Sequence, residues 1–344
     1  SDVCSSDLVR FSTGDTQEDT FDIHVLPHRS PAHTTVNIAL FDPKGETRQL
    51  LDSMPASYAS VNAGSALDAY EVLIVGKEAL TVDGPAPDIS GVRDGLKVVL
   101  FEETPDVLEK RFGFRTAEYG LRKVFARTPD QPLLRGLGAE HLSDWQGEST
   151  ILPPRLDYER SAKFNGAPTV DWCGIPVTRA WRCGHRGNVA SVLIEKPACG
   201  DFLPIVDGGF SLQYSPLMEY REGQGMVLFC QLDVTGRTEP DRAAEILAAN
   251  LLEYAQAWKP QPQRTAYYAG APAGREHLEA TSFRVWAYEG GTIEPNSVLV
   301  LGPNSRNLTT HKGAIAEFAE AGGRILALGL THEEVDALLP IRVS

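Results

Sequence analysis

The sequence predicts an α/β fold in which a three-layer parallel sheet, with helices on both faces, occurs twice in tandem. Unbroken apolar runs of strand length alternate with helical segments from residue 35 onward. The same pattern of strands starts again near residue 264, at an offset of about 227 residues. Since the chain stops at residue 344, we expect the second copy to be truncated and to lack the later strands of the first.

The residues before this pattern predict a different kind of structure. Residues 17–27 alternate apolar and polar side chains, which is typical of a half-buried antiparallel strand. PHRSPAH, residues 27–33, is typical of a linker. The opening SDVCSSDL resembles translated adapter sequence. We therefore interpret residues 1–34 as a non-native start followed by the last strand of a β-sandwich domain and a linker, and the chain as a fragment.

Three apolar segments predict the first strands of the first copy: TVNIALFD (35–42), YEVLIVG (70–76) and KVVLFEE (97–103). GETRQLLDSM (45–54) predicts a helix between the first two strands. Strands and helices joined by short connectors indicate parallel strands linked by right-handed crossovers.

The later part of the first copy is rich in strands and turns. From about residue 145 to 225 short apolar segments alternate with turn residues. Glu222–Gly225 predicts a tight turn between two strands. Residues 239–258 carry apolar side chains at helical spacing, with Asp241 at the start. We therefore assign residues 35–260 to one α/β domain with a β-rich insertion.

The second copy is predicted from three segments in the same order. RTAYYAG (264–270), SVLVLGPNS (297–305) and GGRILALGL (322–330) take the places of the three strands of the first copy. We assign residues 261–344 to this truncated second α/β domain.

Composition excludes several classes of function. The net charge of −14, from 32 basic and 46 acidic residues, disfavours a nucleic-acid partner. The sequence contains no run of 18 consecutive apolar residues, so we predict no membrane span. The five cysteines form no C-x-x-C pair, and Cys183 with His185 offers only two ligands, so we predict neither a metal site nor a cofactor.

Polar side chains follow several of the predicted strands at the end where open parallel sheets bind ligands. The candidate ligand-edge residues are Asp42, Glu102, Glu103, Gln231 and Asp233. Two carboxyl groups about 5 to 9 Å apart can hydrolyse a glycoside, and a polar group of this kind can bind a sugar. The alternative is that the acids cap helix amino termini. We favour this alternative and assign no catalytic residue.

Two further features have a functional and a structural interpretation. Trp145, Trp172 and Trp181 can stack on a sugar ring, but isolated tryptophans in a strand-rich region are more often core anchors. Asp207–Gly209 can form a ligand loop, but a structural turn is the simpler interpretation.

The α/β pattern, with its late hairpin and helix, resembles the flavodoxin-like fold of the class I glutamine amidotransferases. In catalytic members a cysteine on a sharp turn after a buried strand is activated by a later histidine. Here the turn LFEETPD carries Glu102 and Glu103 instead of a cysteine. The later strand MVLFCQLDVTG ends in Gln231 and Asp233, not in a His-x-Glu pair. The amidotransferase triad is therefore absent.

Longer segments resemble another group of proteins. TFDIHVLP, LSDWQGESTILPP and the stretch from GNVASVLIEKP to VTGRTEPD look like the region after the catalytic portion of large multidomain bacterial glycoside hydrolases, which are family 2-like and β-galactosidase-related. The match covers most of residues 17–344. The resemblance implies sugar-binding and immunoglobulin-like β domains and a (β/α)₈ barrel upstream, amidotransferase-like domains without the nucleophile here, and a secreted or periplasmic location.

We therefore expect noncatalytic structural domains that support packing, assembly or the substrate entrance of a glycoside hydrolase. The alternatives are a ThuA-like sugar-binding or sugar-converting domain and an independent amidotransferase-like hydrolase that uses an acid. Expected partners are the upstream catalytic and β domains of the same chain, with carbohydrate and a second copy as further candidates. A polar pocket at the strand ends that gathers Asp42, Glu102, Gln231 and Asp233 favours sugar binding, and an exposed apolar sheet edge or helix face favours the scaffold.

Overall fold

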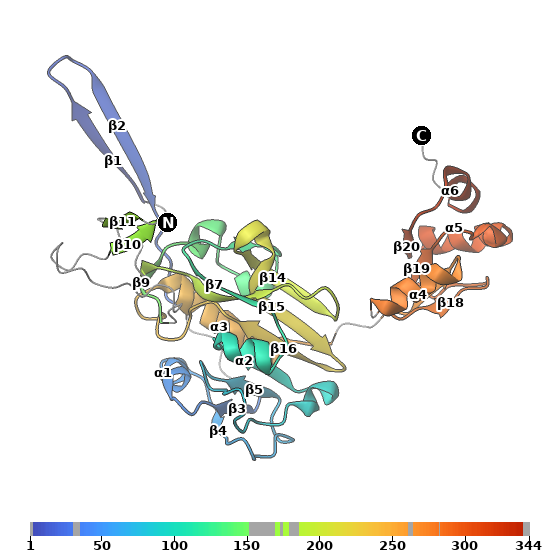
Figure 1. Cartoon of the computed structure of the whole chain (residues 1–344), viewed down its shortest axis with the longest axis horizontal. Coiled ribbons are helices and arrows are strands. Elements are labelled where there is room, and N and C mark those ends of the chain that lie inside the picture. The colour runs from blue at the N-terminus through green and yellow to red at the C-terminus, as the bar shows by residue number, and fades with distance from the viewer. Residues whose placement is uncertain are drawn as a thin grey trace. The chain divides into compact units, whose positions relative to one another are not determined.

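A computed structural model describes residues 3–29, 35–150, 169–172, 175–178, 186–260, 264–281 and 283–339. The chain divides into two compact units, Ser1–Pro260 (unit 1) and Gln261–Ser344 (unit 2), shown from blue to orange and from orange to red in Figure 1. Both are α/β. The described residues form six α-helices, and none of them has the length and apolar character needed to cross a membrane.

Unit 1 is built on one mixed sheet of ten strands. Its strands are β3 (Ile38–Phe41), β4 (Ala59–Ser60), β5 (Val72–Val75), β6 (Lys97–Leu100), β7 (Thr116–Leu121), β8 (Phe125–Ala126), β13 (Ala190–Glu195), β14 (Phe202–Gly208), β15 (Tyr214–Glu222) and β16 (Gly225–Cys230). Its helices are α1 (Glu46–Asp52), α2 (Pro105–Lys110) and α3 (Arg242–Ala257), with short 3-10 helices η1 (Ser90–Asp94), η2 (Pro132–Leu134), η3 (Ala139–Leu142) and η6 (Phe210–Leu212).

The strand order is β4-β3-β5-β6-β16-β15-β13-β7, with β14 pairing to β15 and β8. The first five strands run parallel, and the rest pair antiparallel. The predicted strands at residues 35–42, 70–76 and 97–103 and the helices at 45–54 and 239–258 are confirmed as β3, β5, β6, α1 and α3.

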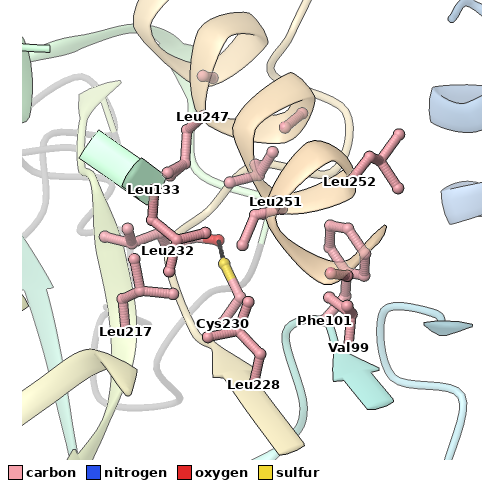
Figure 2. Close-up of a cluster of buried hydrophobic side chains, with 14 of the residues drawn as sticks. Val99, Phe101, Leu133, Leu217, Leu228, Cys230, Leu232, Leu247, Leu251 and Leu252 are labelled. Carbon is pink, nitrogen blue, oxygen red and sulfur yellow. Dashed lines mark hydrogen bonds between the residues drawn. The ribbon is translucent and has the colours of Figure 1, made fainter. Parts of the chain in front are cut away.

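Side chains of the parallel strands alternate between two cores, which makes the unit three-layered. Ile38 and Leu40 pack with α1 and α3, whereas Ala39 and Phe41 face the side of α2 and η1. Figure 2 shows the first core, with Leu228 and Cys230 of β16 beside the apolar side of α3. Because both faces are covered, these strands are continuous apolar runs in the sequence.

The turn predicted at Glu222–Gly225 is confirmed and joins β15 to β16. Gly223 has a φ of 62°, and a Cβ placed there would lie 2.3 Å from the carbonyl oxygen of Arg93. A Cβ on Gly225 would lie 2.2 Å from the carbonyl oxygen of Leu96. Both positions need glycine because the hairpin lies directly against the backbone around η1.

Three small two-stranded sheets complete the described part of unit 1. They pair β1 (Val3–Arg10) with β2 (Thr16–Ile23), β9 (Trp145–Glu148) with β12 (Arg186–Gly187), and β10 (Thr169–Trp172) with β11 (Ile175–Thr178). The strand predicted at residues 17–27 is β2. Its partner β1 occupies residues interpreted from the sequence as a non-native start. Most of the predicted linker after residue 29 lies outside the described residues.

Unit 2 has four parallel strands in the order β18-β17-β19-β20. They are β17 (Ala266–Ala269), β18 (Trp286–Ala287), β19 (Val298–Leu301) and β20 (Arg324–Ala327), with helices α4 (Pro272–Ala280), α5 (Lys312–Glu320) and α6 (His332–Leu338) and the 3-10 helix η7 (Arg306–His311). The three predicted strands of this unit are confirmed as β17, β19 and β20.

The order in unit 2 is the same as that of β4-β3-β5-β6 in unit 1. The residues that follow β6 in unit 1 and β20 in unit 2 also correspond. Thr104 and Thr331 each follow their strand and cap the next helix, accepting a hydrogen bond from a backbone N–H three residues on. On its other side β6 pairs with β16, whereas β20 is the last strand of its sheet among the described residues.

Candidate functional site

The five candidate residues all follow strands of the parallel part of the unit 1 sheet. Glu102 and Glu103 follow β6, and Gln231 and Asp233 follow its direct neighbour β16. Hydrogen bonds of these four residues connect the ends of the two strands. Asp42 follows β3, which is separated from β6 by β5, and it belongs to a different set of contacts.

Asp42 stabilises the start of α1 by hydrogen bonds. Its carboxylate accepts hydrogen bonds from the backbone N–H of Gly45 at 3.1 Å and of Arg48 at 2.7 Å. Gly76, at the end of β5, packs against it so closely that a Cβ there would lie 2.7 Å from the carboxyl carbon. The carboxylate therefore satisfies helix N–H groups, as the capping interpretation predicts.

Glu102 is fully buried and bonded to one residue of the loop after β16. Its two carboxyl oxygens accept hydrogen bonds from the N–H of Thr235 at 2.7 Å and from the Thr235 hydroxyl at 2.9 Å. Burial, with the nearby Asp233 carboxylate, raises the pKa of Glu102 to about 7. This carboxyl group joins two loops and faces no solvent.

Glu103 and Gln231 form the second link between the two strand ends. Gln231 Oε1 accepts a hydrogen bond from the Glu103 N–H at 3.1 Å, and Glu103 Oε1 accepts one from the N–H of Leu80 at 3.1 Å. Glu103 Oε2 and Gln231 Nε2 are buried and have no hydrogen-bond partner among the described residues. Burial raises the pKa of Glu103 to about 8, so the group is mainly a neutral carboxylic acid at pH 7.

Asp233 forms a buried ion pair with Arg237 at 2.7 Å, and the two side chains are 2% and 1% exposed. Arg237 also donates to the carbonyl oxygens of Trp145 and Gln146, each at 2.9 Å. Asp233 accepts from the N–H of Thr150 at 3.0 Å and from the Thr150 hydroxyl. Both charges are therefore compensated within the protein.

Sequence reasoning missed the partners of these acids. Thr235 and Arg237 stand in the same segment as Asp233, and the Asp233–Arg237 spacing of four residues was the available signal. Lys77 was also missed. It is buried after β5 and donates to Glu46 Oε2 at 2.9 Å and to the carbonyl oxygen of Thr150 at 3.3 Å.

A polar cavity of about 510 Å³ lies between α1 and the start of α3. Glu46, Gln49, Thr238, Glu239 and Arg242 are among its lining residues. None of the five candidate residues lines it. Arg242 pairs with Glu245, which also lines the cavity, at 2.9 Å. The walls thus combine charges of both signs with amide and hydroxyl groups.

A second cavity, of about 120 Å³, lies against the other face of the sheet. Its lining is almost entirely apolar and includes Val75, Leu100, Phe112 and Val227, with Arg111 at its side. It offers hydrophobic volume and little polar recognition.

The segments that follow β6 and β16 carry no cysteine. Cys230, on β16, is fully buried, and burial raises the pKa of its thiol well above the ordinary value. The left-handed backbone that a nucleophile elbow requires occurs at Glu78 after β5, with a φ of 46°, and not at Glu102 or Glu103. The buried carboxyl groups after β6 can bind protons, and their residues join the segment after β6 to the segment after β16 by hydrogen bonds.

The other sequence candidates have structural contacts where they are described. Trp145 is 1% exposed, and its Nε1 donates to the carbonyl oxygen of His141 at 2.9 Å. Asp207 forms ion pairs with Arg127 at 3.2 Å and with Lys196 at 3.0 Å. The side chain of Trp172 and all of Trp181, Cys183 and His185 lie outside the described residues.

Three potential metal ligands, His24, Glu140 and His141, have ligand atoms within 4.8 Å of one another. His141 Nδ1 accepts a hydrogen bond from the N–H of Gly138 at 2.8 Å. In a neutral ring this places the proton on Nε2. Metal binding would therefore require His141 to give up this hydrogen bond, so we assign no metal here.

A scan against protein-family models finds none that matches the chain, and a search of curated proteins finds no match.

Proposed function

We propose that this chain forms noncatalytic structural domains of a carbohydrate-active glycoside hydrolase, where they support domain packing and assembly or the substrate entrance. One observation carries the noncatalytic part. The strand-end acids, between 0% and 7% exposed, all bond to their own protein. The link to glycoside hydrolases rests on the sequence resemblance to family 2-like, β-galactosidase-related proteins.

We further propose that the fold is flavodoxin-like, of the class I glutamine amidotransferase type, and duplicated in tandem. Numbered along the chain, the parallel strands of unit 1 have the order 2-1-3-4-5, which is the flavodoxin-like order. Unit 2 has the first four of these positions in the same order. Both features support the proposal.

Apolar side chains at the edges of unit 2 also support a structural role. Trp286 on β18 is 68% exposed, and Leu326 on β20 is 43% exposed. An edge strand that exposes an apolar side chain can pair with a strand of another protein.

The test is hydrolysis of a panel of chromogenic glycosides by the purified chain and by its Glu102→Gln and Glu103→Gln variants. We expect all three proteins to give the rate of the buffer blank. The proposal is wrong if the parent hydrolyses a substrate and a variant with an unchanged circular dichroism spectrum does not.

The polar cavity supports a second candidate function, a ThuA-like sugar-binding domain, at a different place from the strand-end residues, since none of them lines it. Its volume of about 510 Å³ falls in the range of small-molecule sites. If it binds sugar, thermal shift against mono- and disaccharides should show stabilisation that Gln49→Leu and Thr238→Val remove. Asp106→Asn, on the distant α2, is the control and should retain the shift.

The third hypothesis, an amidotransferase-like hydrolase that uses an acid, is the least favoured. It needs an acid that reaches a substrate, and Glu102 and Glu103 are each 0% exposed.

A further inference from the structure

The apolar cavity of about 120 Å³ in unit 1 lies on the sheet face that is covered by α2 and η1, and none of the five strand-end candidates lines it. Three neighbouring strands form one of its walls. They contribute Val75 of β5, Leu100 of β6 and Val227 of β16, each 5% exposed or less. Protein interiors contain few voids larger than a water molecule, so a cavity of this size against the middle of a sheet is unusual.

The connection from β5 to β6 accounts for this cavity. Residues 76–89 form no helix, and the sequence GPAP (84–87) disfavours one, because proline lacks the N–H group that a helix interior needs. Ala86 and Pro87 of this connection line the cavity. Their side chains are small, so they leave volume that the longer apolar side chains of an amphipathic helix would fill. Ala86 and Phe112 are only partly buried, so a ligand can enter on this side.

Arg111, directly after α2, is the one polar side chain among the described residues that line the cavity. Its Nη1 donates to the carbonyl oxygens of Thr81 at 2.7 Å and of Gly84 at 2.9 Å, which fixes the guanidinium against the turn before Pro85. The remaining N–H groups, on Nη2 and Nε, form no hydrogen bond with the described residues, and no carboxylate among them forms an ion pair with Arg111. A positive charge without a carboxylate partner therefore stands beside an apolar volume.

Size and charge together define the chemistry of a ligand. An apolar cavity of about 150 Å³ stays dry and accepts benzene, so this slightly smaller one has room for an apolar group of about the size of one ring. A guanidinium matches the two oxygens of a carboxylate. A neutral hydrocarbon would leave Arg111 without a partner, and inorganic phosphate would leave the apolar walls empty. A carboxylate joined to a small apolar body satisfies both.

We propose that this cavity binds a small monocarboxylic acid, with its apolar body against β5, β6 and β16 and its carboxylate on Arg111. The site is separate from the structural role proposed above, because the cavity shares no residue with the strand-end acids. Apolar contact supplies most of the buried area of the ligand, and the charge-assisted hydrogen bonds of Arg111 select an anion over a neutral molecule of the same shape.

The probes are benzoate and its neutral analogue benzamide, titrated into the full chain at pH 7 and followed by saturation-transfer NMR of the ligand. We expect benzoate to bind at least about tenfold more tightly than benzamide, because only benzoate forms charged hydrogen bonds with Arg111. Ala86→Leu fills the cavity and should abolish binding of both ligands. Ala280→Leu, at an exposed position of α4, is the matched control and should leave binding unchanged.

Arg111→Gln separates recognition of the carboxylate from support of the loop. It should reduce the affinity for benzoate to that for benzamide and leave the affinity for benzamide unchanged, whereas Arg275→Gln on α4 should change neither. The proposal is overturned if the parent chain binds neither ligand or binds both equally, or if Ala86→Leu binds benzoate as well as the parent. It is also overturned if Arg111→Gln weakens both ligands alike, since Arg111 then only supports the loop. The comparison of the two ligands on the parent needs no variant to fold. No sugar is involved, so failure here is distinct from failure of the glycosidase test.

Discussion

Glu102 and Glu103 are carboxyl groups that the fold buries, and their raised pKa values keep Glu102 partly and Glu103 mainly protonated at neutral pH. Burial is the largest cause in each case, and it raises the pKa from 4.5 to about 7 for Glu102 and to about 8 for Glu103. Between pH 4.5 and about 8 these two groups therefore bind more protons in the folded protein than in the unfolded chain. Their contribution to the free energy of unfolding must then fall as the pH rises through this window.

We predict that Glu102→Gln and Glu103→Gln each flatten this fall, because glutamine resembles the protonated acid and does not ionise. The measurement is urea unfolding followed by circular dichroism at pH 5, 6, 7 and 8. Glu276→Gln, at an exposed position of α4, is the control and should keep the slope of the parent. Equal slopes in all four proteins would show that the two buried acids do not titrate in this range.

The ion pair between Asp233 and Arg237 leads to a second prediction. Asp233→Asn leaves the Arg237 charge buried without its carboxylate, and removing one partner of such a pair lowers the free energy of unfolding by about 3–5 kcal/mol. Urea unfolding at pH 7 measures the change. Asp106→Asn breaks the exposed pair with Lys110 and should have no measurable effect. A similar small effect at both sites would contradict the role given to the buried pair.

For single residues, the sequence predicts the type of interaction that a side chain makes better than it predicts which residue the side chain contacts. The capping role expected for the acids holds for Asp42, which binds N–H groups at the start of α1. Glu102 does not cap a helix but binds Thr235, 133 residues away. No local pattern carries information about such a distance, because the contact exists only after β6 and β16 have paired.

At the scale of elements, α3 has a well-defined start that can be tested. Asp241 accepts from the N–H groups of Ala243 at 2.8 Å and Ala244 at 3.3 Å, and it also accepts from Gln146 N–H at 2.6 Å. Asp241→Ala should lower the free energy of unfolding by about 1–2 kcal/mol, near the upper end for a lost cap. Asp241→Asn keeps one acceptor oxygen for the two helix N–H groups but loses the one that Gln146 uses, so it should restore part of the loss. An equally large effect of both variants would show that the helix cap itself contributes little.

The elements themselves were largely predictable, because apolar runs and helical spacing are local. β3, β5, β6, β17, β19 and β20 follow from their apolar runs, and α3 follows from its apolar spacing and Asp241. The antiparallel pairing of β15 with β16 follows from the predicted turn at Glu222–Gly225, but the further addition of β13 and β7 was not predictable. It depends on which edges remain free once the parallel strands have assembled.

For the whole molecule, the separate cores of the two units give a fourth prediction. Leu247 packs in a core of unit 1 and Leu299 in a core of unit 2, and both are 0% exposed. Leu247→Ala and Leu299→Ala should each destabilise one unit by about 2–5 kcal/mol. We expect calorimetry to show two transitions, each shifted by one variant. A single transition shifted by both variants would show that the units unfold together.

The pairing of β6 with β16 also determines how the chain reaches its native state. Glu103 and Gln231, at the ends of these strands, are 128 residues apart, so a long loop must close before the centre of the unit 1 sheet exists. In unit 2 each strand pairs with the next long strand along the chain. Folding rates fall as contacts become less local. Unit 2 should therefore form first, while the centre of the unit 1 sheet is still assembling.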